Sequence, residues 1–142
     1  MSMKKLCALV ILSQMTLLGN AQKEYKPFLA YLYNNEYDVY LRIDFYEESI
    51  TIPGQDLYGE LPGYLGKKNN SFCWVITSAE IKNHTAHLSM INDFGSEDLT
   101  ATLTFKNDSL YELKQVEGSA LKVPKNGKWQ KLPKTLEFKR RK

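Results

Sequence analysis

Cysteine is scarce in this chain of 142 residues, which contains only Cys7 and Cys73. Cys7 lies in an N-terminal segment that we expect to be removed, so the folded domain has one cysteine and no internal disulfide. Its stability must therefore come from packing. Cys73 lies in the apolar run Ser71–Ile76, with no adjacent cation that would activate its thiol. We interpret it as a small buried hydrophobe rather than a nucleophile.

Long apolar runs are also missing. The longest apolar stretch, Leu6 to Gly19, covers 14 residues, whereas a membrane-spanning helix needs about 20. Lys4 and Lys5 precede this stretch, and small residues, Gly19 and Ala21, stand before Gln22, which is the pattern of a cleavable signal peptide. We predict that residues 1–21 are a signal peptide and that residues 22–142 form a single domain. The protein is then exported to the periplasm or the cell exterior, without a membrane span.

Catalytic signatures are absent as well. There is no nucleophile elbow and no phosphate-binding glycine loop, and the only two histidines, His84 and His87, face opposite sides of a predicted strand. We therefore predict a protein without enzymatic activity, cofactor or metal. The one weak metal candidate is a loop in which three carboxylates, Asp93, Glu97 and Asp98, could bind Ca²⁺, although a solvated hairpin turn is the favoured interpretation.

Acidic residues are scarce at the C-terminal end. Residues 22–117 contain eight Lys/Arg and 15 Asp/Glu, whereas residues 118–142 contain nine Lys/Arg and only Glu137. The basic residues are not interleaved with stacking aromatics, and an exported protein has little access to nucleic acid, so no nucleic-acid partner is predicted. The basic end is either a solubilising tail or a docking site for an anionic surface. The acidic body would attract a basic partner.

Alternation of apolar and polar residues with a period of two dominates the mature chain, which predicts strands. Val39, Leu41 and Ile43 alternate with Tyr40, Arg42 and Asp44, while residues 72–77 are apolar on both faces, as in a central strand. Turn residues such as Asn126-Gly127 separate the runs. We predict an all-β fold: a single small antiparallel barrel or sandwich of about eight or nine strands in meander order. The glycine-rich stretch Gly54–Gly66 is predicted to be a mobile loop.

Tyrosine is abundant, and six of the nine tyrosines lie between Tyr25 and Tyr46. Exposed tyrosine together with arginine is typical of protein-binding hot spots, although cross-strand tyrosine pairs can also simply support a sheet. The predicted partner-binding residues are those on the polar face of one strand together with two tyrosines of the glycine-rich loop: Tyr40, Arg42, Asp44, Tyr46, Tyr58 and Tyr64.

These observations favour an exported, non-enzymatic binding protein whose partner is another protein. Its most concrete form is a periplasmic inhibitor or immunity-type protein that masks a toxin or envelope enzyme. One alternative is a barrel that holds a small lipid-like ligand. The other is a glycan-binding or glycan-cleaving domain that uses aromatic stacking with Glu47 or Glu60.

Overall fold

The structure is a computed structural model and describes residues 25–141. The predicted signal peptide, its cleavage site and Cys7 lie outside the described residues. Within residues 25–141, no helix is long and apolar enough to cross a membrane.

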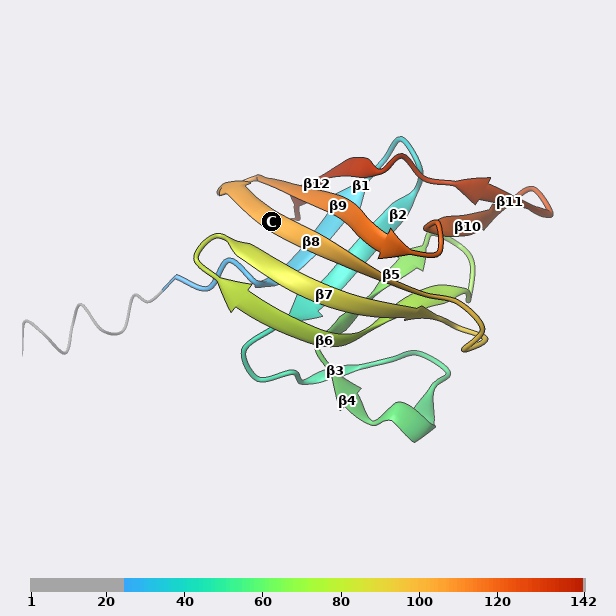
Figure 1. The fold of residues 1–142 in the computed structure, drawn as a ribbon, viewed down its shortest axis with the longest axis horizontal. Coiled ribbons are helices and arrows are strands. Elements are labelled where there is room, and N and C mark those ends of the chain that lie inside the picture. The colour runs from blue at the N-terminus through green and yellow to red at the C-terminus, as the bar shows by residue number, and fades with distance from the viewer. Residues whose placement is uncertain (1–24, 142) are drawn as a thin grey trace, which may run out of the picture.

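Eight antiparallel strands form a closed barrel, which confirms the predicted all-β class (Figure 1). Each barrel strand pairs with the next one along the chain, and the last pairs with the first, so no edge strand of the barrel remains. The barrel strands are β1 (Leu29–Asn34), β2 (Val39–Asp44), β5 (Gly63–Lys67), β6 (Cys73–Lys82), β7 (Thr85–Asn92), β8 (Asp98–Asn107), β9 (Leu110–Gly118) and β12 (Thr135–Arg140).

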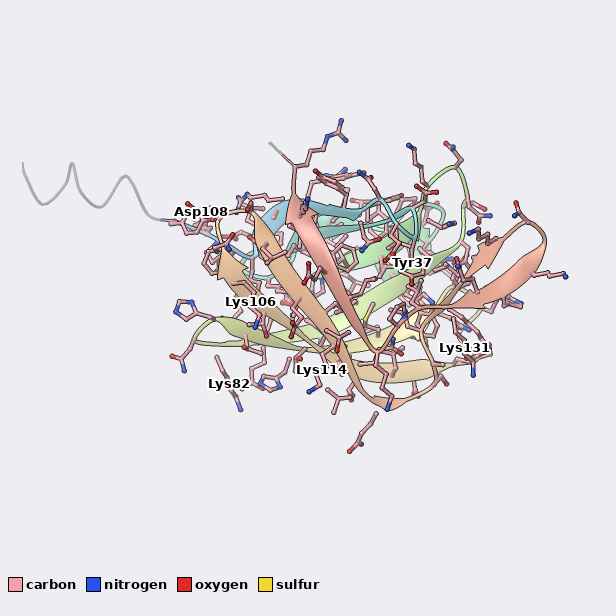
Figure 2. All side chains as sticks on the ribbon, turned by 90° about the horizontal axis from the view of Figure 1, so that it is seen from above. Tyr37, Lys82, Lys106, Asp108, Lys114 and Lys131 are labelled. Carbon is pink, nitrogen blue, oxygen red and sulfur yellow. The ribbon has the colours of Figure 1, made fainter. Side chains whose placement is uncertain are left out.

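Two short ribbons are inserted into this meander. The first consists of β3 (Ile50–Thr51), a 3₁₀ turn (Asp56–Tyr58) and β4 (Glu60–Leu61), and it lies outside the barrel beside β5 and β6 (Figure 1). The second is the hairpin of β10 (Lys122–Lys125) and β11 (Lys128–Lys131), which projects from one end of the barrel. Seen from above, Lys131 of this hairpin lies toward one end of the molecule, and Asp108, in the β8–β9 turn, lies at the other (Figure 2).

The projecting hairpin has a two-residue turn, Asn126-Gly127, as the sequence predicts. Both turn residues have positive φ angles, 53° and 76°, as a type I′ turn requires. Asparagine tolerates this left-handed backbone better than most residues, and glycine adopts it without steric cost. The turn sequence therefore fixes the register in which Pro124 lies opposite Trp129.

The interior of the barrel is filled by the apolar residues that the period-two pattern assigned to one face. Val39, Leu41 and Ile43 of β2 are buried there, as are Leu99, Ala101 and Leu103 of β8. The largest fully buried side chains include Trp74, Tyr111, Phe28 and Phe138. The Trp74 Nε1–H donates a hydrogen bond of 2.8 Å to the Lys122 carbonyl, so the interior is tied to the base of the projecting hairpin.

A second, smaller core explains why β6 is apolar on both faces. Trp74 and Ile76 point into the barrel, while Cys73 and Val75 point outward and are covered by Ile52 of the first ribbon. Burial, assisted by the negative charge of Asp93, raises the pKa of the Cys73 thiol to about 11, which agrees with a buried, unreactive cysteine.

The predicted extent of the glycine-rich loop is wrong at its C-terminal end. The structure places Gly63–Lys67 in barrel strand β5, where all five residues are buried. The sequence signal for this strand is weak because three of its five residues, two glycines and a lysine, are poor strand formers.

Candidate binding surface

Tyrosines from three neighbouring strands meet on the outside of the barrel. In the β1–β2 pair, Tyr31 lies opposite Arg42 and Tyr33 lies opposite Tyr40. In the β2–β5 pair, Tyr64 lies opposite Arg42. Residues directly opposite on one face of a sheet are close enough to interact. We call the surface formed by Tyr31, Tyr33 and Tyr40 the tyrosine face. Tyr64 is buried and packs with Ile52, so it supports this face rather than forming its exposed part.

The rings of the tyrosine face are packed against one another. Tyr31 and Tyr40 stack with their centroids 5.5 Å apart and their planes at 4°. Tyr64 meets Tyr40 edge-on at 5.9 Å and 79°, and the guanidinium of Arg141 lies 5.2 Å from the Tyr31 centroid. The rings already restrict one another. These tyrosine side chains therefore lose little conformational entropy when a partner binds to them.

Gly66 makes room for the central ring of this stack. A Cβ atom at Gly66 would lie 2.4 Å from the Tyr40 ring, so any larger residue would push the ring away. Tyr40 therefore rests on the β5 backbone itself, and the glycine serves close packing rather than loop mobility.

A groove with a volume of about 640 Å³ opens beside the tyrosine face. Three tyrosines line it, namely Tyr31, Tyr33 and Tyr40, and its other walls include Asp38, Lys68 and Arg141. The groove is open to solvent, and it combines aromatic surface with both donors and acceptors of hydrogen bonds.

The charge of this surface differs from that of the sequence around it. Arg42 lies on the face itself, and Lys68 and Arg141 line the groove with a single acid, Asp38. Lys139 lies opposite Tyr33 in the β1–β12 pair. Closure of the barrel thus brings basic C-terminal residues beside the tyrosines. This face is therefore locally basic, although residues 22–117 carry more acidic than basic side chains.

Asp44, which the sequence predicts to contact a partner, is instead occupied within its own turn. Its carboxylate accepts hydrogen bonds from the backbone N–H groups of Tyr46 (3.1 Å) and Glu47 (3.0 Å) and from the Ser49 hydroxyl (2.6 Å). The residue is buried. Burial opposes its charged form, but these hydrogen bonds outweigh that effect and lower the pKa of Asp44 below its ordinary value.

We expect Asp44→Asn to destabilise the domain by about 1–2 kcal/mol, because the amide can replace only part of this acceptor set. A lowered folded pKa stabilises the native state above the ordinary pKa of 3.8, and this contribution disappears as the pH falls through the folded pKa. Urea unfolding at neutral pH and at pH 3 should therefore show a larger gap between wild type and variant at neutral pH. An equal gap at both pH values would contradict this role.

Tyr46 and Tyr58 lie apart from the stack. The Tyr46 hydroxyl accepts a hydrogen bond of 3.1 Å from the Phe28 N–H, beyond the end of β2. Tyr58 lies in the 3₁₀ turn of the first ribbon and is partly exposed. Of the six residues that the sequence predicts to form the site, the structure therefore brings together Tyr40, Arg42 and Tyr64.

Tyr64 and Tyr111 have the most perturbed hydroxyl groups. Burial raises the pKa of Tyr64 to about 12, with the neighbouring Tyr40 adding to the effect. Burial also raises the pKa of Tyr111 to about 12, although Arg140, which donates to the Tyr111 hydroxyl at 3.1 Å, opposes the shift. Both groups thus favour folding below the unfolded pKa of 10.0, and that stabilisation is lost as the pH rises from about 10 to 12.

An alkaline titration followed by tyrosinate absorbance should therefore show a late step near pH 12 that accompanies loss of near-ultraviolet circular dichroism. Tyr64→Phe should reduce the amplitude of this late step. Complete tyrosine ionisation in one step centred near pH 10, with the fold intact, would contradict the burial of these two hydroxyls.

The loop proposed as a weak calcium candidate is held by other contacts. Asp93 accepts a hydrogen bond from the Gln55 side chain, and Glu97 forms a 3.1 Å ion pair with Lys122. Across residues 25–141, no three His, Cys, Asp or Glu side chains are arranged to hold a metal ion.

Sequence reasoning missed four contributors to this surface: Tyr31, Tyr33, Lys68 and Arg141. The alternation in β1, where Ala30 and Leu32 point inward, is a signal that could have placed both tyrosines outside. Arg141 carries no local signal, since its position depends on closure between β12 and β1.

Comparisons of the chain with protein-family models, with curated proteins and with solved structures find no match.

Proposed function

We propose that the protein is an exported, non-enzymatic binding protein and that the tyrosine face is its contact surface. The observation that supports this most strongly is the ordered stack of Arg141, Tyr31, Tyr40 and Tyr64 beside an open groove. Tyrosine and arginine are enriched at the centres of protein interfaces, where they contribute large contact areas. The most concrete form is a periplasmic inhibitor or immunity-type protein that masks a toxin or envelope enzyme.

A protein partner fits this geometry better than the alternatives. A sugar would bind by stacking on a free ring face, whereas Tyr31 is already contacted by Tyr40 and Arg141. A lipid-like ligand would occupy the interior of the barrel, where Trp74, Tyr111 and Phe138 are fully buried among other side chains. The outer surface is therefore the favoured place for a partner.

Export is supported by the N-terminal sequence, and cysteine usage is compatible with it. The apolar stretch Leu6–Gly19 and the small residues before Gln22 have the signal-peptide pattern. Within residues 25–141 the only cysteine is Cys73, which is buried, so this part of the chain requires no internal disulfide to fold in any compartment.

The test is affinity capture from envelope extracts with wild type and with the double variant Arg42→Ala/Arg141→Ala. A matched control is Lys106→Ala/Lys114→Ala, which removes the same charge from β8 and β9 (Figure 2). Wild type and control should capture the same protein, more weakly at high salt, and the face variant should lose it. Equal capture by the face variant, or recovery of glycans or lipids without a protein, would contradict the proposal.

A further inference from the structure

An aromatic cluster lies at the end of the barrel from which the β10–β11 hairpin projects. Phe72 is part of the core, and its ring lies 5.0 Å from that of Trp129 and 5.9 Å from that of Phe94, while the Phe94 and Trp129 rings are 6.5 Å apart. Phe94 is 71% exposed and Trp129 is 52% exposed. Phe94 and Trp129 thus extend the core at Phe72 to the protein surface. They belong neither to the buried barrel interior nor to the tyrosine face, so they form a separate exposed aromatic patch.

The hairpin that carries Trp129 is basic. Residues 122–131 contain four lysines and no acidic residue, and they form the hairpin that stands out from the barrel in Figure 1. Lys125 and Lys128 flank its turn, and both are exposed. Within the part of the chain that the structure describes, neither lysine forms an ion pair.

The acidic residues of the adjacent β7–β8 turn do not cancel this charge at the hairpin tip. Glu97 is paired with Lys122 at the base of the hairpin, 3.1 Å away, and Asp93 accepts from Gln55. Asp98 lines a separate groove along β7, β8 and β9. Lys125 and Lys128 therefore remain available to an anionic surface.

We infer that this tip, formed by Phe94, Lys125, Lys128 and Trp129, binds the surface of an anionic phospholipid bilayer. An indole ring combines an apolar body with a polar N–H and prefers the headgroup region, where Trp129 would lie. Lys125 and Lys128 form the cross-strand pair next to that of Trp129 and lie on the other face of the hairpin, next to its turn. They would contact lipid phosphates when the turn enters the headgroup layer. A hairpin that projects from the barrel can enter a headgroup layer to a shallow depth. This surface shares no residue with the tyrosine face. Failure of either proposal therefore leaves the other unaffected.

The test uses the full chain with vesicles of phosphatidylcholine alone and of phosphatidylcholine mixed with phosphatidylglycerol. The chain has two tryptophans, and Trp74 is fully buried, so a change in emission on vesicle addition reports on Trp129. The emission should move to shorter wavelength with the anionic vesicles only. Lys125→Gln and Lys128→Gln should each weaken vesicle binding roughly fivefold, and high salt should weaken it further.

Matched controls separate the tip from general effects. Lys106→Gln/Lys114→Gln removes two lysines elsewhere, and Leu57→Ser removes a fully exposed apolar residue of the first ribbon; neither should change binding. The N-terminal apolar stretch is identical in every variant, so vesicle binding through it would be the same in wild type and in the lysine variants. Phe94→Ser and Trp129→Ala should also weaken vesicle binding. The lysine variants alter only exposed side chains, so the test remains valid even if an aromatic variant does not fold.

Several outcomes would overturn the inference. These are equal binding to neutral and anionic vesicles, sedimentation with vesicles without a shift of Trp129 emission, or equal weakening by the control lysine variants. Capture of an acidic protein through Lys125 and Lys128, without vesicle binding, would assign the tip to a protein partner and overturn it as well.

Discussion

Trp74→Ala is expected to lower the free energy of unfolding by about 4 kcal/mol, the largest loss from any single truncation considered for this domain. The side chain is fully buried inside the barrel, and its removal leaves a cavity lined by atoms that lose their contacts. It also leaves the Lys122 carbonyl without its 2.8 Å hydrogen bond from the indole. Typical domains of this size have 5–15 kcal/mol of stability in total, so guanidinium unfolding followed by circular dichroism would detect the change easily.

Trp129→Ala is the natural control for this prediction because the two tryptophans differ in burial. Trp129 is about half exposed. Its truncation to alanine should lower the free energy of unfolding by less than about 2 kcal/mol. A small loss for Trp74→Ala would show that the interior is not packed as described. Co-purification of a lipid-like molecule, seen by native mass spectrometry, would then support a ligand in the barrel.

Arg42→Ala and Tyr33→Ala should each weaken partner binding about thirtyfold, equivalent to about 2 kcal/mol. Arg42 is exposed on the tyrosine face and Tyr33 lines its groove, so both are positioned to contact a partner directly. The free energy of unfolding should change by less than about 1 kcal/mol, because neither side chain belongs to a core cluster. Isothermal titration calorimetry with the captured partner, together with urea unfolding, measures both quantities.

Tyr40→Ala should behave differently from these two variants. The Tyr40 ring is stacked on Tyr31, meets Tyr64 and rests on Gly66, so its removal should reduce both binding and stability. Lys114→Ala, on β9, should change neither. If Arg42→Ala and Tyr33→Ala bind like wild type while the control does not, the contact surface lies elsewhere.

The strands were predictable from sequence wherever one face is apolar and the other polar. In β8, the inward residues Leu99, Ala101 and Leu103 alternate with threonines, and a shift by one residue would expose the whole apolar set. The Asn126-Gly127 turn was equally clear, because two successive residues with positive φ strongly favour this pair.

Features that depend on distant parts of the chain were not predictable. The apolar outer face of β6 indicated burial, but only the structure shows that Ile52 covers it. β5 carries a weak signal because two of its five residues are glycines, and Gly66 is explained only by the ring of Tyr40, which lies 26 positions earlier in the sequence. Pairing across the barrel seam likewise decides that Lys139 lies beside Tyr33.

The central claim is that the tyrosine face contacts a partner protein, and site-specific photocrosslinking tests it most directly. A benzophenone amino acid would replace Tyr33 in one variant and Lys114 in another, and intact cells of the source organism would be irradiated. The account predicts one dominant protein adduct from position 33, absent from position 114 and lost when Arg42→Ala is added. Equal adducts from both positions, or an adduct from position 114 alone, would contradict it.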